Sequence, residues 1–130
     1  MKAHFILYVE DQARSTAFYA HVLAMPPQLD VPGMTEFRLG EETILGLMPC
    51  SGIKRLLGEK LPDPSKASGI PHAELYLVID DPNVYHQRAL DNGAVELSKL
   101  MLRDWGHEVA YSLDPDGHVV AFARDRASSA

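Results

Sequence analysis

The fold is decided by two matching stretches, HFILYVED at residues 4–11 and ELYLVIDD at residues 74–81. Both are rich in aliphatic and aromatic residues, end in acidic ones, and are offset by 70 residues. Segments of this kind favour β-strands, and Asp11 and Asp81 then occupy positions suited to a helix N-cap. The repetition predicts two related halves, each opening with a strand that leads into a helix.

The segments after these aspartates have the signals of helices. The first helix is expected over residues 12–23, where apolar residues recur at helical spacing until the prolines at 26 and 27. The second is expected to begin at Pro82, which suits the first turn of a helix, and to end at Gly93, which can adopt left-handed backbone.

Three further strands are expected in each half, separated by turn residues. They are residues 28–31, 34–39 and 43–48 in the first half, and residues 95–101, 108–113 and 119–123 in the second. This predicts an α+β fold of two βαβββ modules within one domain spanning residues 1–130, since a chain of this length suits a single core. Module 1 covers about residues 1–48, a linker covers 49–72, and module 2 covers about 73–126.

Composition excludes several classes of partner. Twelve Lys and Arg against eighteen Asp and Glu give a net charge of −6, which disfavours binding to nucleic acid. The longest apolar runs are far shorter than the roughly 20 residues of a membrane helix. Cys50 is the only cysteine, which fits a reducing compartment. We therefore expect a cytoplasmic protein with no nucleic-acid or membrane partner.

Alternation along the opening strands separates an aliphatic face, expected to lie under the helix, from a polar one. The polar face holds His4 and Tyr8 in the first strand, and Glu74 and Tyr76 in the second. Because the halves are related, we expect the imidazole and the carboxylate to face one concavity. Trp105 precedes a glycine in the connection to a late strand, where its ring could stack on a planar or cationic ligand. These five residues are the predicted ligand-binding set.

The doubled βαβββ pattern, with YVED at residues 8–11 and DPDGH at residues 114–118, resembles the vicinal oxygen chelate superfamily. This superfamily includes glyoxalase I, bleomycin-resistance proteins and extradiol dioxygenases. The resemblance implies an open, curved mixed sheet with its helices on the convex side, and a concave side that holds a divalent metal or an organic ligand. A homodimer is expected, because such sheets leave edges that need cover.

The family's metal ligands come from the first and last strands of each module, and the resemblance can be followed to those positions. His4 and Glu74 match the two first-strand positions. Ala121 occupies the place of the usual last-strand glutamate, and either Gly46 or Met48 occupies its counterpart in the first module. A catalytic metal site ordinarily has about three protein ligands, so these residues alone supply too few.

Two functional hypotheses follow, and whether the chain is an enzyme stays open between them. The first is a small-molecule-binding protein similar to bleomycin-resistance proteins, without a metal cofactor, whose acidity suits a cationic ligand. The alternative is a glyoxalase-like lyase or isomerase that holds Ni, Zn or Mn with His4 and Glu74. In that case His72, His107 or His118 could supply a further ligand. A third possibility is a structural subunit whose pocket has degenerated.

The histidines inside the helices, His21 and His86, are expected to be solvent-facing or partly buried and are given no role.

Overall fold

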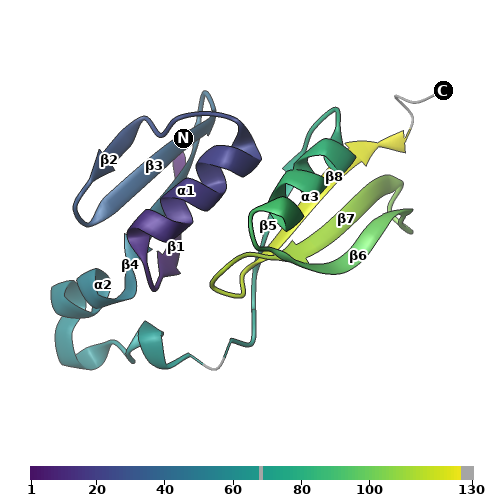
Figure 1. The fold of residues 1–130 in the computed structure, drawn as a ribbon. Coiled ribbons are helices and arrows are strands. Elements are labelled where there is room, and N and C mark those ends of the chain that lie inside the picture. The colour runs from purple at the N-terminus through teal and green to yellow at the C-terminus, as the bar shows by residue number, and fades with distance from the viewer. Residues whose placement is uncertain (68, 127–130) are drawn as a thin grey trace. The chain divides into compact units, whose positions relative to one another are not determined.

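A computed structural model describes residues 1–67 and 69–126. Its elements in chain order are β1 (Ala3–Val9), α1 (Gln12–Leu23), β2 (Leu29–Val31), β3 (Met34–Gly40), β4 (Thr43–Pro49), α2 (Cys50–Leu57), η1 (Gly58–Lys60), η2 (Pro64–Lys66), β5 (Glu74–Val78), α3 (Pro82–Asp91), β6 (Val95–Leu102), β7 (His107–Leu113) and β8 (Val119–Asp125) (Figure 1). Of these residues, 1–20 and 24–67 form one compact unit, unit 1, and 21–23 with 69–126 form unit 2.

The two sheets have the same topology. The strand order is β1-β4-β3-β2 in one and β5-β8-β7-β6 in the other. The opening strand of each sheet pairs in parallel with the last strand of its module, and the remaining pairs are antiparallel. The predicted α+β class and the repeated βαβββ pattern are therefore confirmed, with two four-stranded mixed sheets.

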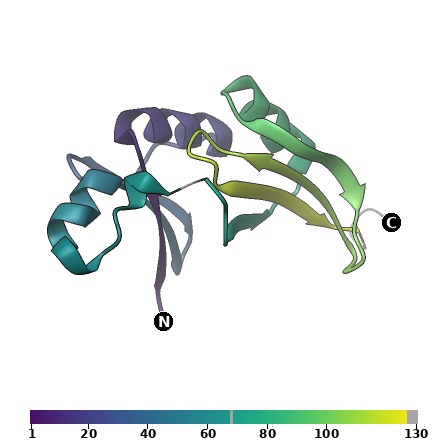
Figure 2. The ribbon, with the colours of Figure 1, turned by 90° about the horizontal axis from the view of Figure 1, so that it is seen from below.

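In unit 1, helix α1 covers one face of the sheet (Figure 2). The residues that point to this face from β3 and β4 are fully buried and include Phe37, Leu45 and Leu47. The expectation that the aliphatic face of β1 lies under the helix holds only in part. Val9 is fully buried, but Phe5 keeps 56% of its surface exposed because β1 forms an edge of its sheet.

In unit 2, helix α3 packs on one face of the sheet through Tyr85, whose ring centroid lies 5.8 Å from that of Phe122. The same face holds His86, whose Nε2 lies 3.0 Å from the Glu96 carboxylate. His86 is only 5% exposed, so the expectation of a solvent-facing or partly buried side chain is wrong. The error arose because helical spacing alone does not reveal which side of a short helix meets the sheet.

The helix ends follow the sequence signals with one exception. Asp11 caps α1, since its Oδ1 accepts a hydrogen bond of 3.0 Å from the backbone N–H of Arg14. Asp81 occupies the corresponding position of α3 but makes no capping hydrogen bond with its side chain. Its backbone ψ of 67° departs from the extended geometry typical of an N-cap. Beyond α3, Gly93 has the left-handed φ of 102° that the turn requires.

Between the modules the chain forms more regular structure than the sequence predicts. A helical turn is expected at residues 53–57, whereas α2 spans Cys50–Leu57 and is followed by two short 3-10 turns. Across the described residues, no helix combines the length and apolar character needed to cross a membrane.

Candidate functional site

The face of the unit 2 sheet opposite α3 brings together several residues with reactive or hydrogen-bonding side chains. Strand register places Tyr76 beside Ala121, and Ala121 beside Tyr111. Both tyrosines pack on a fully buried floor of Val109, Ala121 and Ala123. We refer to this surface as the open face of unit 2.

Three side chains on this open face meet at one phenol oxygen. The indole N–H of Trp105 donates to Tyr76 Oη at 2.9 Å. His107 Nδ1 lies 2.6 Å from the same oxygen, and its ring is inclined by only 25° to that of Tyr76. Trp105 is held by this bond while 57% of its surface stays exposed. Tyr76 therefore orients an indole ring whose surface is available for contact.

Charge on the open face comes from Glu74 and Arg103. Glu74 is exposed, and no ion pair is recorded for its carboxylate within residues 1–67 and 69–126. The pKa of Tyr111 is raised, first by burial and then by repulsion from the charge of Glu74 and from that of Tyr76 when its phenol is ionised, while Arg103 opposes the shift. The carboxylate of Glu74 is thus close enough to Tyr111 to disfavour ionisation of its phenol.

Arg103 has a positioning role on the same face. Its guanidinium lies 5.1 Å from the ring centroid of Tyr111, which suits a cation–π contact. One terminal nitrogen donates to Ser98 Oγ at 2.6 Å and to the carbonyl of Val109 at 2.9 Å. These bonds tie the connection that carries Trp105 to strands β6 and β7.

In unit 1 the polar face of β1 provides a second group of side chains. His4 Nδ1 lies 3.7 Å from Glu36 Oε2, so the two form an ion pair when the imidazole is protonated. Gln28 Nε2 donates to the other oxygen of Glu36 at 2.9 Å and so orients the carboxylate. Tyr8 lies two pleats further along the same face and is 37% exposed.

The structure therefore brings together some of the predicted ligand-binding residues. Trp105 and Tyr76 are hydrogen bonded, and Glu74 lies on the same strand and face as Tyr76. His4 and Tyr8 share the polar face of β1 in unit 1. That His4 and Glu74 share one concavity stays a prediction.

The residues at the family's metal-ligand positions do not fit a metal ion. Strand pairing places Gly46 beside Ile6 in module 1, and it places Ala121 beside Tyr76 in module 2. Gly46 is therefore the counterpart of Ala121, and Met48 is not. Neither side chain carries a donor atom. The space beside Gly46 is filled, since a Cβ there would lie 3.0 Å from Ile6 Cγ1. Among the described residues no group of three or more His, Cys, Asp or Glu side chains is arranged to hold a metal.

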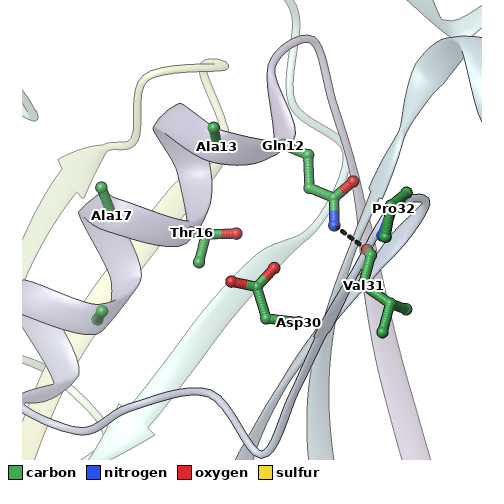
Figure 3. A pocket seen from close by; sticks show the side chains of 8 residues that line it. Gln12, Ala13, Thr16, Ala17, Asp30, Val31 and Pro32 are labelled. Carbon is green, nitrogen blue, oxygen red and sulfur yellow. Dashed lines mark hydrogen bonds between the residues drawn. The ribbon is translucent and has the colours of Figure 1, made fainter.

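A cavity of about 540 Å³ in unit 1 lies between α1 and the turn after β2, on the helix-covered side of the sheet (Figure 3). Three residues that line it, Gln12, Thr16 and Asp30, hydrogen bond to Thr35, which is fully buried. Thr35 Oγ1 lies 2.9 Å from both Gln12 Nε2 and Thr16 Oγ1, and 3.3 Å from Asp30 Oδ1. The network ties α1 to the β2–β3 hairpin, and none of the predicted site residues lines the cavity.

Sequence reasoning missed two partners, His107 and Glu36. The sequence suggests for His107 only the role of a further metal ligand, whereas the structure joins it to Tyr76. The alternation of side chains along β7 does indicate this position. His107, Val109 and Tyr111 are two residues apart, so all three point to the same face as Ala121. No comparable signal identified Glu36, because its approach to His4 depends on the pairing of β3 with β4 and of β4 with β1.

Comparison with known proteins gives one family match and many structural matches. The family model described as "Glyoxalase-like domain" matches residues 2–125. A glyoxalase-related enzyme from Fulvimarina pelagi superposes with a TM-score of 0.81 at 18% identity, covering 97% of this chain and 88% of that one. A glyoxalase/bleomycin resistance protein/dioxygenase family enzyme from Burkholderia phytofirmans PsJN gives a TM-score of 0.78 at 18% identity, covering 93% and 95%. No curated protein matches the chain.

Proposed function

The chain belongs to the glyoxalase-like domain family of the vicinal oxygen chelate superfamily, and on that premise we propose that it binds a small organic ligand without a catalytic metal. The ligand lies against the open face of unit 2, where it contacts Trp105, Tyr76 and Glu74. The preferred ligand is a planar organic cation. In the same proposal His4 and Tyr8 are ligand-contacting residues on the polar face of β1 in unit 1.

The observation that carries this proposal is the hydrogen bond from Trp105 to Tyr76. An exposed indole that is already oriented loses little side-chain entropy when a ligand stacks on it. A cation over an indole face gains electrostatic attraction from the ring, and the exposed carboxylate of Glu74 adds to it. Binding of this kind needs no reacting group, and it agrees with the absence of donor atoms at Gly46 and Ala121.

Calorimetric titration with benzamidine, a planar cation at neutral pH, tests the proposal. We expect saturable binding that weakens several-fold in Trp105→Ala and in Glu74→Gln. The matched controls are Leu56→Ala, which truncates another exposed apolar side chain, and Glu59→Gln, which neutralises another exposed carboxylate. If no saturable heat is seen at millimolar benzamidine, or if the controls weaken binding equally, the proposal is wrong.

The alternative, a metal-dependent lyase or isomerase that uses His4 and Glu74, has fewer residues in its favour. His4 has a carboxylate neighbour in Glu36, but further donors would have to come from outside the family's usual positions. Elemental analysis of the purified protein separates the two hypotheses. Stoichiometric Ni, Zn or Mn that is lost in His4→Ala would establish the alternative.

For the assembly, we propose that the protein is a homodimer. The support is the position of β1 and β5 at sheet edges, where backbone groups are left to pair. Light scattering at micromolar concentration is expected to give twice the mass of the chain. A stable monomer would contradict the dimer.

A further inference from the structure

The hydrogen bonds at Tyr76 determine which proton His107 presents to solvent. Trp105 Nε1 and His107 Nδ1 both lie within hydrogen-bonding distance of Tyr76 Oη, at 2.9 and 2.6 Å. An indole nitrogen can only donate. Tyr76 Oη therefore accepts from Trp105, and its own proton needs a different acceptor.

His107 Nδ1 is the only recorded acceptor for that proton within the described part of the chain. If the neutral imidazole carried its proton on Nδ1 instead, Nδ1 and Trp105 would both donate to Oη, and the phenol proton would have no acceptor there. The arrangement that satisfies every group is Trp105 N–H to Tyr76 Oη, and Tyr76 O–H to His107 Nδ1. This places the imidazole proton on Nε2.

Nε2 faces away from this network. None of the described residues hydrogen bonds to it, and it is not a buried atom without a partner, so it reaches solvent. Protonation of the ring does not change its role, because both nitrogens of an imidazolium are donors. Nε2–H of His107 is thus a donor both in the neutral tautomer that Tyr76 favours and in the protonated imidazolium.

We infer that His107 is a specificity-determining residue of the open face, and that its Nε2–H selects organic cations that also carry an acceptor oxygen, above all a carboxylate. The inference deepens the proposed function and rests on it. Glu74 and Trp105 recognise the cationic, planar part of such a ligand. Tyr76, which orients the indole of Trp105, also fixes the proton of His107 on Nε2. The indole and the Nε2–H donor are therefore both organised before the ligand binds.

The tautomer can be measured without any ligand. Two-bond proton–nitrogen correlation spectra of protein labelled with nitrogen-15 histidine identify which ring nitrogen carries the proton, and His107→Gln assigns the signals. We expect neutral His107 to be protonated on Nε2. A neutral ring protonated on Nδ1 would overturn the inference whether or not a ligand binds.

The ligand preference is tested with benzamidine and 4-amidinobenzoate, which differ by one carboxylate. We expect wild type to bind 4-amidinobenzoate about tenfold more tightly, as for a hydrogen bond to a charged group. His107→Ala should lose this preference while still binding benzamidine, and His107→Gln, which retains an N–H donor, should keep part of it. His21→Ala, at an exposed histidine that has no role in the site, is the control.

The outcomes separate the two proposals. Wild type that fails to bind benzamidine contradicts the proposed function, and the tautomer then decides the assignment of His107. Wild type that binds both compounds equally, or a preference that persists in His107→Ala, overturns the role of His107 and leaves the proposed function standing.

Discussion

At the scale of single residues, the phenol of Tyr111 reports the potential on the open face. Burial and the neighbouring Glu74 raise the pKa of Tyr111, so the folded protein holds this proton more tightly than the unfolded chain does. The resulting contribution to stability is complete below the ordinary tyrosine pKa and is lost as pH rises through the higher folded value. Stability should therefore fall in the alkaline range more steeply in wild type than in Tyr111→Phe.

Urea unfolding of the two proteins at a series of alkaline pH values measures this difference. Spectrophotometric titration of the phenols should also show a late-ionising tyrosine that is missing from the variant. Parallel pH profiles for wild type and Tyr111→Phe would show that Tyr111 ionises as it does in the unfolded chain.

Thr35 shows how a single buried hydroxyl can join a helix to a hairpin. Its Oγ1 is close to Gln12, Thr16 and Asp30, and it has no exposed surface. Thr35→Val keeps the shape of the side chain but leaves the donors of Gln12 and Thr16 without this acceptor. We expect unfolding free energy to fall by about 1–3 kcal/mol in urea denaturation. The exposed Ser51→Ala should change it little, and equal losses in both variants would refute the role of the network.

At the scale of elements, the two modules contain a natural comparison of helix caps. Asp11 accepts a hydrogen bond from the backbone of Arg14, whereas the side chain of Asp81 makes no capping bond. Asp11→Ala should therefore cost about 1 kcal/mol of unfolding free energy, and Asp81→Ala should cost clearly less. Thermal or urea unfolding of both variants checks the ranking, and an equal or reversed ranking would contradict it.

Local sequence signals predict the bounds of some elements but not the contacts between them. α1 was predicted at its observed bounds and β4 to within one residue because local signals mark them: alternation, a capping aspartate and prolines. The bonding state of Asp81 was not predictable, since it depends on a backbone angle rather than on residue type. On the open face, Tyr76 and Trp105 were each identified from local position, but their hydrogen bond and the part played by His107 depend on how β5, β7 and β8 pair.

At the scale of the whole molecule, the prediction of one domain means that units 1 and 2 unfold together. The chain has a single tryptophan, Trp105, and it lies in unit 2. Thr35→Val alters unit 1, so in a cooperative molecule it should shift the unfolding transition seen by Trp105 fluorescence as much as the transition seen by circular dichroism. Two separate transitions, with Trp105 unaffected by the substitution, would show that the units unfold independently.

The central claim is that an oriented indole on the open face of unit 2 binds an organic cation. The most direct measurement follows the indole N–H resonance of Trp105, the one indole in the chain, during titration with benzamidine. We predict a saturable shift of this resonance that is much reduced in Glu74→Gln. A resonance that does not move while benzamidine reaches millimolar concentration would contradict the claim.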